Sequence, residues 1–223
     1  SILLRAPLIR ISAAGIGNFT IIKVTKKYTF CIKHLKRQET DMDNKKIIQT
    51  YKAAYRLLDR YSPIDGDCGL MCSAACCMSA SGCDGEEMGI YMLPGEDLMH
   101  DKNDAWLTWN AENSEDYGFP ESWDETFWFV KCSGPAACRR SLRPIQCRTF
   151  PLMPYISEYG ELIMIYNDNE LPYACPLIED EIPLNDDFVR ATRTVWKHLL
   201  RDRRIRDMVE QDSELLREAL SEE

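Results

Sequence analysis

The stretch of sequence that decides the fold reads Asp67-Cys68-Gly69-Leu70-Met71-Cys72-Ser73-Ala74-Ala75-Cys76-Cys77, and Cys83 follows it closely. With Cys83 it holds five of the ten cysteines, on a backbone otherwise rich in Gly, Ala and Ser. Three more, Cys132, Cys138 and Cys147, gather further along the chain, and Cys175 completes the set. Thiols at this density are expected to be metal ligands, disulfides or redox groups. We therefore expect the rest of the chain to be a scaffold that brings these cysteines together.

The length and composition are those of an ordinary soluble globular protein. A chain of 223 residues with 45% hydrophobic and 28% charged residues can form one well-packed domain. No apolar run approaches the ~18 residues that a membrane span needs. The net charge of -9 argues against general nucleic-acid binding, which favours a basic face. The sequence thus predicts metal ions as partners, and neither nucleic acid nor a membrane.

The N-terminal segment 1–41 differs from the rest in charge. It carries eight Lys or Arg against Glu39 and Asp41. One interpretation is a basic, partly disordered arm that binds an acidic partner. Another is upstream sequence read as protein, because the codons of Gln38 and Glu39 can carry an AGGAG tract shortly before the codon of Met42. We favour the second, with one metal-binding domain at 42–223 and its cysteine core at 66–178.

The redox compartment decides between metal ligands and disulfides. Arg5 and Arg10 interrupt the apolar patches near the beginning of the sequence, so no secretory signal is recognisable. The expected compartment is the reducing cytoplasm, where clustered cysteines are more often metal ligands than disulfides.

Hydrophobic periodicity predicts helices at both ends of the domain and short strands between them. Apolar residues recur at helical spacing from Asp43 to Leu58, from Asn185 to Leu200 and over 204–221. Short strands are predicted at 87–93, 126–130 and 161–166, whereas the acidic, aromatic segment 100–125 is predicted to be loop-like with one short helix at most. The fold class is therefore α+β: a small cysteine-rich irregular core with a few short strands, flanked by an N-terminal helix and two C-terminal helices.

The spacing of the first cluster suits a chelating loop, because ligands two to four residues apart can aim at one ion. On a helix, Cys68, Cys72 and Cys76 would share one face. Cys76 and Cys77 are adjacent, and adjacent side chains diverge in helix and strand alike, so they cannot easily share an ion. Either the pair divides between two sites or one member is spare. Eight ligands in two groups would allow two four-coordinate sites.

Several neighbours of the cysteines fit a thiolate site. Small residues between them let backbone N–H groups approach the sulfurs. Arginines 139, 140, 143 and 148 could offset the net charge of four thiolates around a zinc ion, although ordinary surface charge is an equal alternative. A radical-SAM motif is excluded, because its third cysteine would fall at Ala75.

The segment from Cys138 to Pro151 resembles a known family. Its pattern Cys-x5-Pro-x2-Cys-Arg-x-Phe, preceded by a Cys-Cys pair, is similar to the YkgJ-type cysteine-cluster family (CxxCxxCC), which is described as a zinc- or iron-chelating domain. The resemblance covers about residues 66–178 and is most specific at Arg143-Pro144 and Cys147-Arg148. The family pattern opens Cys-x2-Cys-Gly-x-Cys-Cys, whereas here the spacing is looser and Ser73 stands where glycine is expected.

The resemblance implies a set of ligands that bind zinc or an iron–sulfur cluster. Carried over by position, the metal ligands are Cys68, Cys72, Cys76, Cys77, Cys132, Cys138, Cys147 and Cys175, and Arg143 and Arg148 are the residues next to the cofactor. Cys83 has no counterpart in the pattern, and Cys31 is given no role.

Three functions remain open at this stage. The first is a metal-binding protein held together by zinc or iron–sulfur ligation. The second is an iron–sulfur enzyme of protein modification or redox type, because the flagellin lysine-methylase group carries a similar cysteine cluster. The third is an interaction module that uses segment 100–125. His100 and His198 each lack a second histidine at ligand spacing, and no phosphate loop or Ser-His-Asp set can be assembled.

Overall fold

The structure is a computed structural model that describes residues 43–78, 89–167, 171 and 173–221. The chain divides into two compact units, Ser1–Asp43 and Asn44–Glu223, and the architecture below is that of the second. The predictions for segment 1–41 and for Cys31 and Cys83 lie outside the described residues.

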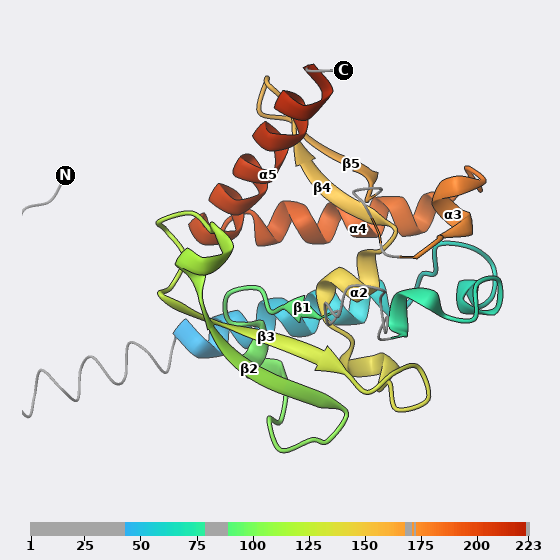
Figure 1. The fold of residues 1–223 in the computed structure, drawn as a ribbon, viewed down its shortest axis with the longest axis horizontal. Helices are drawn as coiled ribbons and strands as arrows, with labels where there is room; N and C mark the ends of the chain where they lie inside the picture. Colours follow the sequence, from blue (N-terminus) through green and yellow to red (C-terminus); the bar gives the residue numbers. More distant parts are fainter. Residues whose placement is uncertain (1–42, 79–88, 168–170, 172, 222–223) are drawn as a thin grey trace, which may run out of the picture. The chain divides into compact units, whose positions relative to one another are not determined.

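A three-stranded antiparallel sheet forms one part of the fold (Figure 1). Its order is β1 (Ile90–Tyr91), β3 (Thr126–Cys132) and β2 (Leu107–Asn113), so β3 lies in the middle. Leu107 pairs with Cys132 and Trp109 with Val130. Strand β3 pairs with β2 along its whole length and ends at Cys132, the first thiol of the second cluster.

A hairpin and two long helices form the C-terminal part (Figure 1). The hairpin joins β4 (Leu152–Ile156) to β5 (Leu162–Tyr166), and it packs against α4 (Asp186–Leu199) and α5 (Arg203–Ser221). Asp186 and Asp187 lie in the first turn of α4 and Lys197 and His198 in its last, which suits the helix dipole.

The core forms where the N-terminal helix, residues 43–58, meets α4 and α5. The helix buries one stripe at helical spacing, because Tyr51, Ala54, Tyr55 and Leu58 recur every three to four residues. The other buried members of this core include Leu93, Trp123, Phe127, Ile145, Val195, Trp196, Leu199, Ile205, Met208 and Val209. A second, smaller core under the sheet holds Met92, Trp106, Leu107 and Val130.

Short helical elements connect these layers and carry most of the chemistry. They are the 3-10 turns Cys68–Leu70, Ala75–Cys77, Glu96–Met99, Ser114–Tyr117 and Arg140–Leu142, and the short helices α2 (Ile145–Thr149) and α3 (Pro176–Glu179). Among the residues that the structure describes, every helix is too short or too polar to cross a bilayer.

The predicted α+β class is confirmed, and two local expectations change. Segment 100–125 contains strand β2 rather than only loop and a short helical turn. The stretch from Cys68 to Cys77 is two 3-10 turns, not one helix. Asn185 precedes α4 but makes no side-chain cap; its amide donates instead to the carbonyl of Ser62 at 3.2 Å.

Gly95 offers a test of how closely the N-terminal helix packs against the turn that contains Gly95. It has a φ of +80°, and a Cβ built on it would lie 2.5 Å from Cγ2 of Ile47. Gly118 has a similar φ of +65° but nothing within 4 Å of the added Cβ. We expect Gly118→Ala to lower the free energy of unfolding by about 1 kcal/mol through backbone strain alone, and Gly95→Ala by about 1–3 kcal/mol more through the clash.

Urea denaturation of the two variants measures this difference. Adding Ile47→Ala to Gly95→Ala removes the clash, so in the double variant the cost of the glycine substitution should approach that seen at Gly118. Equal losses for the two single variants would contradict the close packing of Gly95 against the helix.

Candidate metal centre

The first cysteine cluster is a folded loop. Asp67 begins it, and its carboxylate accepts a hydrogen bond from the Gly69 N–H at 3.0 Å. Ser73 and Ala74 both lie in the left-handed region, with φ of 53° and 57°. This region is unusual for residues other than glycine. These two residues turn the chain between the two 3-10 segments, and the N–H of Ala74 donates to the carbonyl of Gly69 at 2.7 Å.

The second cluster comes from three different elements. Cys132 ends β3, and its thiol lies 3.7 Å from the carbonyl of Gly134. Cys138 follows in the loop before the 3-10 turn at Arg140–Leu142, and Cys147 lies in α2. Cys175 directly precedes α3 and is the one buried thiol among the eight candidates. All eight are free thiols rather than disulfides.

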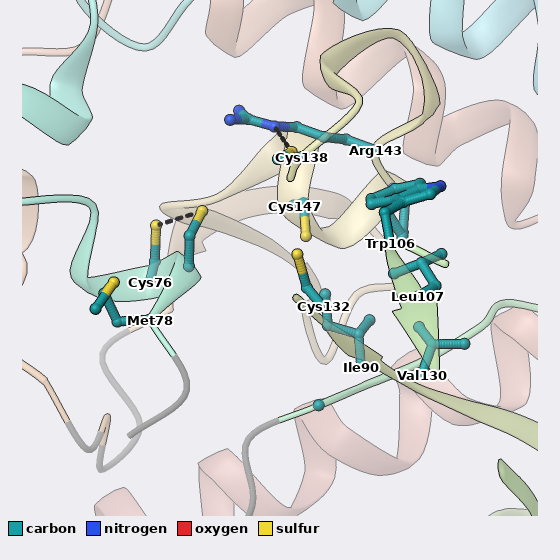
Figure 2. Close-up of a pocket in the computed structure, with 13 residues that line it drawn as sticks. Cys76, Met78, Ile90, Trp106, Leu107, Val130, Cys132, Cys138, Arg143 and Cys147 are labelled. Carbon is teal, nitrogen blue, oxygen red and sulfur yellow. Dashed lines mark hydrogen bonds between the residues drawn. The ribbon is translucent and has the colours of Figure 1, made fainter. Parts of the chain in front are cut away.

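The two sequence clusters meet at a cavity of about 70 Å³ (Figure 2). Cys76 and Cys77 from the first cluster line it together with Cys132, Cys138 and Cys147 from the second. In Figure 2 the sulfurs of Cys132 and Cys147 point toward each other at its centre. Its opposite wall is apolar and consists of Ile90, Trp106, Leu107 and Val130.

A second, smaller cavity of about 20 Å³ gathers the remaining thiols. Cys68, Cys72 and Cys76 line it with Cys175, which comes from the far end of the cysteine core. Phe150, Tyr173 and Leu177 form apolar walls around it. Within the described ranges, no three Cys, His, Asp or Glu side chains converge tightly enough to make a ready-formed site for a single ion. The thiols are therefore grouped around two cavities without being arranged around one point.

Burial favours the neutral form of four of these cysteines. Desolvation raises the pKa of Cys68, Cys132 and Cys175, and it raises the pKa of Cys147 to about 12. Cys77 is the exception, because a hydrogen bond from the thiol of Cys76, whose sulfur is 3.9 Å away, lowers its pKa to about 6. A bound cation would favour the thiolate form of all of them.

Arg143 brings positive charge to the larger cavity. Its Nε lies 3.2 Å from the sulfur of Cys138, and its guanidinium also acts on Cys77 and Cys147. It lines the cavity directly, and its place next to a cofactor stays a prediction.

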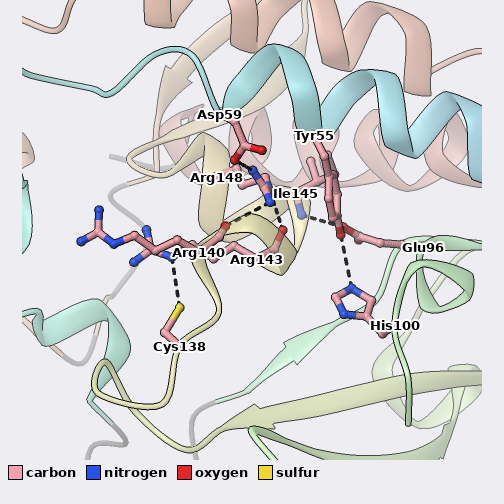
Figure 3. A network of polar contacts seen from close by, with 9 residues as sticks. All are labelled: Tyr55, Asp59, Glu96, His100, Cys138, Arg140, Arg143, Ile145 and Arg148. Atoms are coloured by element: carbon pink, nitrogen blue, oxygen red, sulfur yellow. Dashed lines mark hydrogen bonds and ion pairs between the residues drawn. The ribbon is translucent and has the colours of Figure 1, made fainter. Parts of the chain in front are cut away.

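Arg148 has a different place from Arg143, although the sequence paired the two (Figure 3). Its side chain is only 4% exposed and forms an ion pair with Asp59. It donates to the carbonyls of Arg143 and Arg140, and it stacks on the Tyr55 ring at 4.1 Å. Arg148 therefore fixes the loop that presents Arg143, while Arg140 pairs with Asp67 at the start of the first cluster.

Glu96 is a functional-looking residue that sequence reasoning missed. It is fully buried, and its carboxylate accepts from the Ile145 N–H at 2.6 Å, the Tyr55 hydroxyl at 2.8 Å and the Leu93 N–H at 3.3 Å (Figure 3). Burial raises its pKa from the usual 4.5 to about 7. It fixes the N-terminus of α2, the helix that carries Cys147. It directly follows the Pro94-Gly95 turn, and no sequence signal distinguishes it from a solvated turn carboxylate.

His100 lies beside this network and away from the thiols. Its Nε2 is 3.3 Å from the Tyr55 hydroxyl, and its ring packs near Trp106 and Trp109. Burial lowers its pKa to about 4, so it is neutral at ordinary pH.

Comparisons of this chain with protein-family models, with curated proteins and with solved structures found no match.

The raised pKa of Glu96 predicts a specific pH dependence of stability. The folded protein binds the Glu96 proton more tightly than the unfolded chain does. The contribution of this proton to the free energy of unfolding is therefore fully present below about pH 4.5 and is lost as the pH rises through about 7. Between about pH 5.5 and about pH 8 it should remove about 2 kcal/mol from the free energy of unfolding. Glu96→Gln carries no titratable group, so its stability should lack this component.

The measurement is denaturant unfolding of the wild-type protein and of Glu96→Gln at the two pH values. The difference between the two proteins cancels the contributions of the titratable groups that they share. Glu125→Gln, at an exposed position, is the control and should keep the wild-type pH dependence. If Glu96→Gln also keeps it, the buried carboxylate does not titrate in this range.

Proposed function

We propose that this chain is a metal-binding protein whose cysteine thiolates hold zinc or an iron–sulfur cluster. The observation that carries the proposal is the meeting of the two cysteine clusters. Cys77, Cys132, Cys138 and Cys147 line one cavity although they come from four separate elements or loops, and Cys175 joins the thiols of the first cluster at another. Eight thiols kept free and grouped in this way suit soft metal ions.

The residues present fit such a group. The donors at both cavities are sulfur atoms, which zinc and iron–sulfur clusters prefer. Arg143 would offset part of the negative charge that several thiolates bring together. Neutral thiols lose their protons when they bind a metal, so metal binding should be weaker at low pH.

The metal would supply folding energy to a part of the chain that has little regular structure. The segments that carry the cysteines are short 3-10 turns and loops, and several of their apolar residues, such as Leu70, Met71 and Met78, are exposed. Ligation free energy is folding free energy when the unfolded chain holds no site. The resemblance to the YkgJ-type family is part of this proposal, and so is the reducing cytoplasm, where thiols stay free for ligation.

A second candidate function is an iron–sulfur enzyme. One observation favours it: the larger cavity is bounded on one side by thiols and on the other by Ile90, Trp106, Leu107 and Val130. An apolar wall beside a cluster could bind part of a substrate. Reactions of protein modification, of the lysine-methylase kind, or of electron transfer belong to this candidate.

Anaerobic purification followed by metal analysis and a visible spectrum tests the proposal. We expect metal to co-purify with the full chain. Zinc would give a colourless protein, and an iron–sulfur cluster would give a brown one that absorbs in the visible range. Iron with this absorption is required by the enzyme candidate, so stoichiometric zinc in a colourless protein would exclude it.

Removing the metal provides the second readout. Chelation under reducing conditions should lower the free energy of unfolding by several kcal/mol, because ligation supplies folding energy. Adding zinc back, or reconstituting with iron and sulfide, should restore it. A protein that contains no metal after anaerobic purification, binds none on reconstitution and is equally stable with a chelator would contradict the proposed function.

A further inference from the structure

Cys76 and Cys77 occupy the boundary between the two cavities. Their sulfurs are 3.9 Å apart, yet the two residues have different surroundings. Cys77 lines only the larger cavity, with Cys132, Cys138 and Cys147. Cys76 lines both cavities, and in the smaller one it lies with Cys68, Cys72 and Cys175. Adjacent side chains diverge, so one ion cannot easily take both.

The proximity of the other thiols gives the same division. Cys68 and Cys175 each have Cys72 as a close electrostatic neighbour, and Cys68 also has Cys175. Cys132 and Cys147, in contrast, each have Cys77 and Cys138 as theirs. Cys76, besides Cys77, has Cys68 and Cys72 as its electrostatic neighbours.

Groups that stabilise negative charge lie at both cavities. Arg143 lines the larger cavity and contacts Cys138. At the smaller cavity, the N–H groups of Leu177 and Ile178 at the start of α3 face the sulfur of Cys175. Four thiolates around a divalent ion or a cluster leave net negative charge, which such donors stabilise. Two sites, each with four thiols and a local donor, therefore account for all eight cysteines.

Resting on the proposed function, we propose that this chain holds two separate four-thiolate metal sites and crosses from one to the other between Cys76 and Cys77. Cys68, Cys72, Cys76 and Cys175 form the first site, and Cys77, Cys132, Cys138 and Cys147 form the second. The residues Ser73 and Ala74, which lie in the left-handed region, turn the chain between Cys72 and Cys76. In the 3-10 turn at Ala75–Cys77 that follows, the adjacent thiols of Cys76 and Cys77 then belong to different sites.

The division predicts a pattern of metal loss in cysteine variants. Full-length Cys175→Ala and Cys132→Ala, purified anaerobically, should each retain about half the wild-type metal content, because each removes a ligand of one site only. The double variant Cys132→Ala/Cys138→Ala should match Cys132→Ala, since both changes fall in one site. The double variant Cys132→Ala/Cys175→Ala should lose nearly all metal.

Native mass spectrometry of the wild-type protein gives a readout that does not depend on the variants folding. It should count two metal centres per chain, either two zinc ions or two clusters. A single centre per chain, or complete metal loss in both single variants despite a folded circular dichroism spectrum, would overturn the division into two sites while leaving metal binding intact. A wild-type protein without any metal would instead overturn the proposed function itself.

Discussion

The buried carboxylate of Glu96 is the interaction on which the arrangement of the site depends. It accepts hydrogen bonds from Tyr55 on the N-terminal helix, from the main chain at Leu93 and from the first N–H of α2 at Ile145. This one buried carboxylate therefore holds together three segments of the chain inside the core. Because α2 carries Cys147, and Arg148 of the same helix stacks on Tyr55, the position of the larger thiol group follows from this contact.

The thiols themselves are placed by elements with little regular structure. Strand β3 ends at Cys132, a short helix carries Cys147, and turns carry the others. Desolvation favours the neutral form of Cys68, Cys132, Cys147 and Cys175, so the polypeptide alone gains little from bringing these thiols together. A soft cation would reverse this balance, since it favours the charged thiolates and links the turns to one another. The proposed metal would therefore account for both the grouping of the cysteines and the irregularity of the loops that carry them.

Part of this could be predicted from the sequence. Helical periodicity predicted the buried stripe with Tyr51 and Leu58 and the course of α4, because 3.6-residue spacing is a strong local signal. Strand β2 was missed, since Asn110, Glu112 and the surrounding acidic residues resemble a loop and its pairing with β3 is a long-range contact. The division between Cys76 and Cys77 was left open by their adjacency, and only the positions of Cys132 and Cys175 indicate how it is made. Glu96 could not be found, because no local pattern distinguishes a buried carboxylate from a solvated one.

The central proposal is that this chain binds a metal and that its sulfur atoms form the entire inner shell of that metal. X-ray absorption spectroscopy of the anaerobically purified protein, at the edge of whichever metal it contains, measures this directly. The account predicts a first shell composed of sulfur only, at about 2.3 Å for zinc, or an iron–sulfur shell with an additional iron scatterer for a cluster. A first shell of nitrogen and oxygen atoms, of the kind that surface carboxylates and histidines provide, would contradict it.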